Sequence, residues 1–187
     1  TGGKQVLYNA FMATINKGDE VLIPAPYWVS YPDIILLAGG KPKIVKCTEK
    51  DNFKLTPKIL KKAISKKTKW IILNSPSNPT GSAYTKDEII SLSKILSKYK
   101  KTYILSDDIY EHITYDDFKF FTIAQIDKLK KRTLTMNGVS KSYSMTGWRI
   151  GYAAGPKEII KAMAKIQSQS TSNPTSISQA AAVEALN

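Results

Sequence analysis

Short apolar runs alternate along this chain with longer segments of helical periodicity. Each run is too short for a helix and too continuous for a strand with one exposed face, so it is typical of a strand buried on both faces of a parallel sheet. The runs cover residues 21–23, 70–73, 103–105 and 133–136, and a further strand is expected at 150–154. The pattern predicts an α/β fold with a mostly parallel central sheet, whose ligands gather at the carboxyl ends of the strands.

Helix start signals stand between the predicted strands. Thr85 is followed three residues later by Glu88, which is the pattern of a capping box. Other helices are expected to begin after Gly2-Gly3, at Thr56-Pro57, at Pro156 as the first helical position, and at about Ser176. No repeat, low-complexity tract or linker divides the chain, so we expect one domain over residues 1–187.

Composition limits the class of protein. A chain of 187 residues that is 42% hydrophobic can bury a core, and it contains no run of about 20 apolar residues that would span a bilayer. We therefore expect neither a membrane partner nor a secretory signal. The lone Cys47 cannot form an internal disulfide, which favours a structural thiol and the reducing cytoplasm.

The net charge of +13 raises the question of a nucleic-acid partner. The lysines are spread through the helical segments, where they are expected to form solvated outer faces. We therefore expect no nucleic-acid partner. With one histidine, His112, and one cysteine, the chain has no constellation for a metal site, and His112 is expected to be structural.

The run from Gly138 to Gly151 sets Lys141 among small residues and places Arg149 eight positions later. Lys141 follows a buried strand, so an enclosed amine is expected there, with a lowered pKa suited to covalent chemistry. Arg149 is one of only two arginines, and its planar guanidinium suits a phosphate. The other, Arg132, follows a lysine-rich stretch and is interpreted as a generic surface residue.

Four other places carry polar or aromatic residues at strand or helix ends. Read from the residues alone, each has a structural alternative, such as a helix cap for an acid or core packing for an aromatic ring. They are Gly3 and Lys4 before a helix, Trp28 in an aromatic turn, Asn78 in a proline-rich turn, and Asp107 or Asp108 with Tyr110.

The Gly-x-Ser-Lys segment with its following arginine resembles the pyridoxal-phosphate attachment region of class I aminotransferases of fold type I. The resemblance extends from Thr1 to about Leu186, including Asn-Pro-Thr-Gly at 78–81 and Asp-x-x-Tyr at 107–110. It is nearest the bacterial aspartate or aspartate/prephenate branch. It implies a three-layer sandwich, the large domain of that fold, without the family's N-terminal segment and C-terminal small domain.

The resemblance also implies roles for individual residues. Lys141 would be the catalytic lysine that forms a Schiff base with pyridoxal 5′-phosphate. Asp107, selected over Asp108 by the family pattern, would pair with the pyridine nitrogen, and Tyr110 and Asn78 would bond the phenolic oxygen. The phosphate would be held by Gly3, Lys4 and Arg149. The ring would stack on Trp28, and Trp28 and Asn78 would border the substrate carboxylate.

The implied activity is transamination between an amino acid, aspartate or glutamate, and a 2-oxo acid, in a homodimer of the full-length protein. The chain by itself is expected to be inactive. Two alternatives stay open at this point. One is another fold type I enzyme that uses the same cofactor, such as a lyase or a decarboxylase. The other is an aminotransferase-like sensor domain of a transcription regulator.

Overall fold

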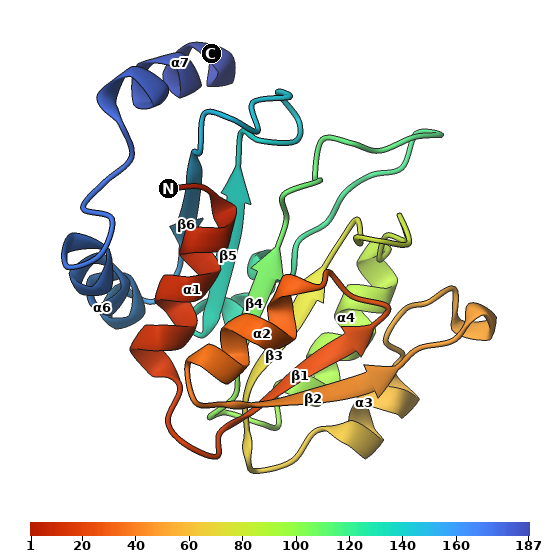
Figure 1. Ribbon diagram of the computed structural model, residues 1–187. Coiled ribbons are helices and arrows are strands. Elements are labelled where there is room, and N and C mark those ends of the chain that lie inside the picture. The colour runs from red at the N-terminus through yellow and green to blue at the C-terminus, as the bar shows by residue number, and fades with distance from the viewer.

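The computed structural model describes residues 1–187 and has a six-stranded sheet at its centre (Figure 1). The strand order is β2-β1-β3-β4-β5-β6, and all neighbours are parallel except β5 and β6. The strands are β1 (Glu20–Ala25), β2 (Lys41–Lys46), β3 (Thr68–Asn74), β4 (Tyr103–Asp107), β5 (Thr133–Gly138) and β6 (Gly151–Ala154). The predicted α/β fold with a mostly parallel sheet is confirmed.

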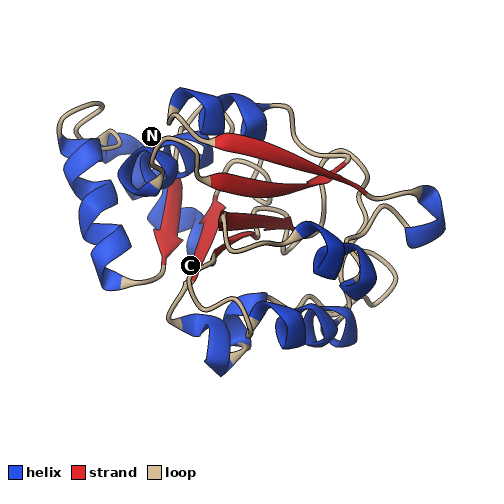
Figure 2. Ribbon diagram, turned by 90° about the horizontal axis from the view of Figure 1, so that it is seen from below, coloured by secondary structure: helices blue, strands red, loops and turns tan.

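Helices cover both faces of this sheet, which gives three layers (Figure 2). The helices are α1 (Gly3–Thr14), α2 (Ser30–Leu37), α3 (Pro57–Ala63), α4 (Lys86–Leu96), α5 (Asp127–Lys130), α6 (Lys157–Ser168) and α7 (Ser176–Leu186). Two single turns of 3-10 helix lie at Glu49–Asp51 and Ile123–Gln125. No helix is both long enough and apolar enough to cross a membrane.

The two faces of the sheet bury separate apolar clusters because successive strand residues point to opposite sides. In β3, Trp70 and Ile72 pack with α1, α2 and α6, whereas Ile71 and Leu73 pack with α3, α4 and α5. A strand buried on both faces has little contact with water on either face, so most of its residues are apolar, and the sequence shows near-continuous apolar runs there.

The predicted helix starts agree with the structure to within one residue. Thr85 and Glu88 form both hydrogen bonds of a capping box at α4, and the Thr56 side chain accepts from the backbone N–H of Ile59 at α3. Pro156 is the residue before α6 and not its first helical position. The difference is one residue, and the fixed φ of proline suits either place.

Apart from the two single turns of 3-10 helix, three elements were not predicted: β2, α2 and α5, the last of which has only four residues and is too short to show a helical period. β2 is an edge strand of the sheet, with exposed lysines at Lys41 and Lys46 and one buried residue, Val45. An edge strand has a neighbour on one side only and needs no continuous apolar run. α2 is eight residues long and has a proline in its first turn, so its helical period is short.

The interpretation of Arg132 as a generic surface residue is wrong. Its guanidinium donates to the carbonyl oxygens of Leu96, Tyr99 and Thr102, the last at 2.6 Å. These carbonyls lie at and just after the carboxyl end of α4, where unpaired carbonyls favour a cation. Partial burial lowers the pKa of Arg132. The residue therefore fixes the turn that connects α4 to β4.

Candidate active site

A pocket of about 160 Å³ lies at the carboxyl ends of the parallel strands. Asn74 ends β3, Asp107 ends β4, and the loop that carries Lys141 follows β5. All eight residues predicted from the sequence line this one pocket, namely Gly3, Lys4, Trp28, Asn78, Asp107, Tyr110, Lys141 and Arg149. The remaining lining residues are Tyr31, Asn74, Ile109, Met136, Ser140 and Thr146.

Asp107 supplies a buried carboxyl group at the base of the pocket, with only 3% of the residue exposed. Tyr31 Oη donates to its Oδ2 at 2.6 Å, whereas its Oδ1 receives only a long contact of 3.4 Å from the backbone N–H of Ile109. Burial raises the pKa of Asp107 to about 7, against the lowering effect of the Tyr31 hydrogen bond. The carboxyl thus keeps an oxygen available for a cationic partner.

Tyr31 is a residue of this site that the sequence did not reveal. It lies in α2, is 2% exposed, and packs edge-on against Trp28 with ring centroids 5.4 Å apart. Burial, followed by the charge of Asp107, raises its pKa well above the ordinary value, so the phenol stays protonated and donates. A tyrosine three residues after Trp28 could have drawn attention, but only the fold shows that it reaches Asp107.

Asp108 points away from the pocket. Ser106 Oγ donates to Asp108 Oδ1 at 2.6 Å and lies 3.2 Å from Thr122 Oγ1. Burial raises the pKa of Asp108 to about 6, and hydrogen bonds from Ser106 and Thr122 lower it. Because neighbouring residues at a strand end face opposite sides, only Asp107 of the two acids lines the pocket.

Asn74 holds the loop that presents Asn78. Its Nδ2 donates to the backbone carbonyl of Asp107 at 2.9 Å, and its Oδ1 accepts from the backbone N–H of Asn78 at 2.8 Å. One side chain therefore ties the end of β3 to the end of β4 and to the loop. This role of Asn74 is not visible in the sequence, because it depends on how the ends of β3 and β4 lie beside each other.

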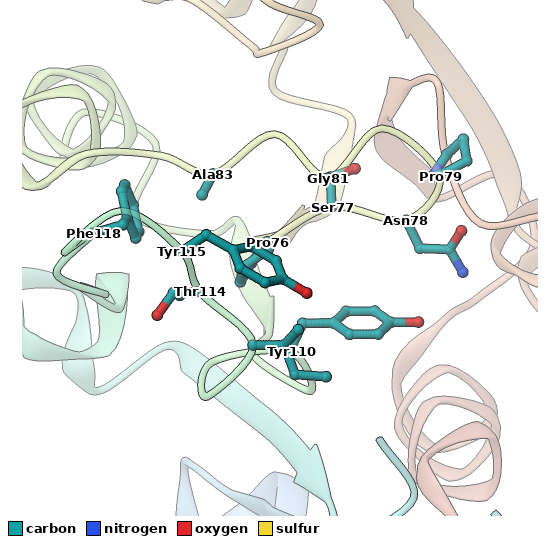
Figure 3. Close-up of a pocket in the computed structure, with 11 residues that line it drawn as sticks. Pro76, Ser77, Asn78, Pro79, Gly81, Ala83, Tyr110, Thr114, Tyr115 and Phe118 are labelled. Carbon is teal, nitrogen blue, oxygen red and sulfur yellow. The ribbon is translucent and has the colours of Figure 1, made fainter. Parts of the chain in front are cut away.

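Asn78 and Tyr110 stand together between this pocket and a larger open hollow of about 520 Å³. In Figure 3 the amide of Asn78 and the hydroxyl of Tyr110 point to the same side of the view. Burial and the charge of Asp107 raise the pKa of Tyr110, whereas the side chain of Asn78 lowers it by hydrogen bonding. The larger hollow is otherwise lined by prolines, small residues and apolar or aromatic side chains, and no charged group lines it.

The amino end of α1 meets Arg149 at the opposite side of the pocket. No side chain caps the first turn of α1, and Gly2 precedes it with a φ of +85°, in the left-handed region that favours glycine. A Cβ at Gly2 would overlap the guanidinium of Arg149, which donates to the Thr146 carbonyl at 2.6 Å. Uncapped helix amides and a guanidinium in contact form a site for an anion.

Lys4 and Trp28 form another wall. The Lys4 ammonium lies 5.1 Å from the ring centroid of Trp28, within the range of a cation–π contact. Trp28 is half-buried, and it also packs on Tyr31. The indole is therefore held from one edge while part of its surface stays open to the pocket.

Lys141 lines the pocket but is exposed, so the predicted enclosed setting is wrong for this chain. The residue lies in the turn that follows β5, at the margin of the sheet, and the next eight residues of this loop are half-buried or exposed. Its backbone is anchored by the preceding residues Val139 and Ser140, which are buried. The position of the lysine is set by the strand, while the residue itself is open to solvent at the edge of the pocket.

His112 and Cys47 lie outside the pocket lining. His112 is exposed, with Nε2 3.5 Å from a carboxylate oxygen of Glu111. Cys47 is buried with its sulfur 3.6 Å from the Val45 carbonyl, and burial raises its pKa to about 11. A thiol in this setting stays protonated and packs as a small apolar group, as expected.

Comparison with known proteins gives the family. A family model described as aminotransferase class I and II matches residues 1–187. The chain belongs to this family. An aspartate/prephenate aminotransferase of Cereibacter sphaeroides is 64% identical over 187 residues, covering all of this chain and 47% of the relative. The chain thus spans about half the length of the curated relatives that it matches.

Solved aminotransferase structures have the same fold. The aspartate aminotransferase of Rhizobium meliloti superimposes with a TM-score of 0.98 at 56% identity, covering 100% of this chain and 47% of the other. That of Thermus thermophilus with maleate gives 0.94 at 45% identity, with 100% and 48% coverage. The order of the strands and the layers of helices are therefore those of this aminotransferase family.

Proposed function

We propose that residues 1–187 form the cofactor-binding large domain of an enzyme that moves an amino group between an amino acid, aspartate or glutamate, and a 2-oxo acid. The proposed cofactor is pyridoxal 5′-phosphate. Family membership and the names of the relatives support the proposal. The observation that carries it is one pocket in which a lysine amine, a buried carboxyl group and an anion site meet.

The anion end of the pocket fits a phosphate group. The first amides of α1 have no side-chain cap, and Gly2 leaves space that the guanidinium of Arg149 fills. Gly151 of β6 approaches so closely that a Cβ there would overlap the backbone nitrogen of Gly3. We assign phosphate binding to the backbone of Gly3 and Lys4 and to Arg149, since helix amides and a guanidinium together favour a dianion.

The other end of the pocket fits a pyridine ring with a phenolic oxygen. Asp107 presents a carboxylate oxygen for the ring nitrogen, and the phenol of Tyr110 and the amide of Asn78 stand where an oxygen acceptor would be bonded. Trp28 supplies a flat apolar face. A buried carboxylate opposite a ring N–H keeps that nitrogen protonated, because separating the charges in an apolar site is costly.

When bound, the cofactor supplies an electron-withdrawing ring that stabilises the electron pair left on the substrate Cα after loss of a proton. Lys141 Nζ would hold the cofactor covalently at rest, and as a free amine it would take the Cα proton and return it. Tyr110 and Asn78 orient the oxygen beside this centre. The protein thus directs protons and fixes geometry.

The remaining expectations concern the complete protein. We propose that it acts as a cytoplasmic homodimer, and that substrate choice depends on side chains outside residues 1–187, with Trp28 and Asn78 bordering the substrate carboxylate. The exposure of Lys141 agrees with a site that further protein has to enclose. We expect little or no turnover from residues 1–187 alone.

The first experiment is to reduce the complete protein with borohydride in the presence of pyridoxal phosphate, and to map the modified peptide by mass spectrometry. We expect a single adduct on Lys141 that Lys141→Ala abolishes. Lys119→Ala, which removes an exposed lysine outside the pocket, is the matched control and should leave the adduct in place. Adducts spread over many lysines, with none favoured, would contradict the assignment.

The second experiment concerns the reaction class. With aspartate and 2-oxoglutarate, the complete protein is expected to form glutamate and oxaloacetate in equal amounts. Release of carbon dioxide or ammonia without a matching amino product would instead identify a decarboxylase or a lyase on the same fold.

A further inference from the structure

The amino ends of the same strands carry a second, separate feature. An open hollow of about 490 Å³ lies there, at the end of β3 and β4 opposite to Asn74 and Asp107. Six of its seven lining residues are cationic, namely Lys69, Lys100, Lys101, Lys128, Lys131 and Arg132, and the seventh is Tyr103. We call these residues the basic hollow. They come from three segments that are distant in sequence, so the cluster is a product of the fold.

The charge of the basic hollow is not neutralised within the chain. No carboxylate lines it, and its lysines form none of the ion pairs of the structure, which involve Lys43, Lys54 and His112. An adjoining hollow of about 420 Å³ shares Lys100 and Lys101, adds Lys66 and Lys98, and also lacks an acid. Like charges that line one hollow repel one another. A bound anion would relieve that repulsion.

Two of the cations are held in place by the fold. Arg132 is fixed by its three bonds to backbone carbonyls, and these also fix the turn that carries Lys98, Lys100 and Lys101. Lys69 is half-buried, with Nζ 5.6 Å from the ring centroid of Tyr103. A preformed centre with flexible lysines around it is better suited to an anion than a row of free side chains, because less conformational freedom is lost on binding.

We propose that the basic hollow binds a small anion that carries several phosphate charges, such as a tripolyphosphate chain. Its volume lies in the range of small-molecule sites, and lysine ammonium groups bind phosphate as point charges. None of the large exposed apolar side chains lies in either hollow, so nothing there would insert into a lipid surface. Tyr103 is already packed on Trp70, with ring centroids 5.0 Å apart, and is not free to stack on a nucleobase.

The test uses the complete protein loaded with pyridoxal phosphate, so that the phosphate site proposed at Arg149 is already filled. Binding of inorganic tripolyphosphate to this protein is measured by isothermal titration calorimetry at low salt. The variant Lys100→Gln/Lys101→Gln/Lys131→Gln removes three exposed charges of the hollow. Lys58→Gln/Lys61→Gln/Lys62→Gln removes three exposed charges from α3 and is the matched control. We expect one site per chain, an affinity lowered about tenfold or more by the first variant, and a change of less than about twofold in the control. Both variants should keep the melting temperature of the parent.

Three results would overturn the proposal. Equal weakening by both variants would show that only the net charge matters. Absence of measurable binding at millimolar tripolyphosphate would show that the hollow holds no anion. Tighter binding of a short oligonucleotide than of tripolyphosphate, lost in the hollow variant, would make a nucleic acid the occupant.

Discussion

Asp107 ends β4 and Lys141 lies in the turn after the neighbouring strand β5, and both line the same pocket, but their exposure to solvent is opposite. Asp107 is buried and hydrogen-bonded by Tyr31, whereas Lys141 is exposed on a loop. A buried polar group is coupled to the stability of the fold, and an exposed one is not. The strand-end side of the pocket should therefore be sensitive in both stability and activity, and the loop side in activity alone.

The largest effect on activity is expected from Lys141→Ala. Loss of the amine removes covalent attachment and proton transfer, and turnover of the complete enzyme should fall by about 10⁴-fold or more. The free energy of unfolding should change by no more than about 0.5 kcal/mol, since the side chain is exposed. Steady-state kinetics and urea unfolding measure the two quantities. A large loss of stability would break the comparison.

The two adjacent acids provide a matched pair. Asp107→Asn should lower kcat by about 10²–10³-fold, as expected for a group that stabilises charge in the transition state, and Asp108→Asn should lower it by less than about tenfold. Both should destabilise the protein by about 1–3 kcal/mol, because each alters a buried hydrogen bond. Equal kinetic losses would show that Asp108 also serves the pocket.

Arg149→Lys probes the loop side again. A lysine keeps the charge but loses the planar, bidentate guanidinium, so the affinity for pyridoxal phosphate should fall by about 10–100-fold, the value of one charge-assisted hydrogen bond. Stability should be unchanged, because Arg149 is exposed and bonds only the Thr146 carbonyl. Equilibrium dialysis measures the affinity for the cofactor, and thermal unfolding of the cofactor-free protein measures its stability.

The smallest kinetic effect, about twofold to tenfold, is expected from Tyr31→Phe, which removes one hydrogen bond from Asp107. The pH dependence of stability is more informative. The pKa of Asp107 is raised from 3.8 to about 7, so its contribution to stability is full below pH 3.8 and is lost as pH rises through 7. The hydrogen bond from Tyr31 lowers this pKa. Its removal in Tyr31→Phe should raise the pKa of Asp107 further, so the decrease in stability should extend to a higher pH than in the parent.

Thermal unfolding of the cofactor-free protein between pH 4 and pH 9 checks this shift. Asp107→Asn has no group to titrate at this position, and its curve should be flatter than that of the parent in the same interval. A curve for Tyr31→Phe that moves to lower pH would contradict the role given to the hydrogen bond.

The sequence allowed much of the fold to be predicted. β1, β3, β4 and β5 are buried on both faces, and burial on both faces produces a local signal of continuous apolar residues. The caps of α3 and α4 depend on residues three positions apart, which are also visible locally. β2 and α2 have weaker local patterns, since one is an edge strand and the other is short.

The eight predicted site residues form one pocket, but their surroundings could not be predicted. Tyr31 meets Asp107, 76 positions later in the chain, only because α2 packs over the sheet. Arg132 reaches three carbonyls of a different loop. Neither contact follows from periodicity or from a motif, because each joins segments that are remote in sequence.

The sequence by itself determined the type and order of most elements and the inventory of chemical groups, because these follow from residues a few positions apart. Only the tertiary structure decided that Asp107 faces the pocket and Asp108 does not, that Lys141 is exposed, and that scattered lysines converge at the amino ends of the strands. Those outcomes depend on strand orientation and on packing between segments that are remote in sequence. The burial of a side chain and the charges around it are defined only once these segments have come together.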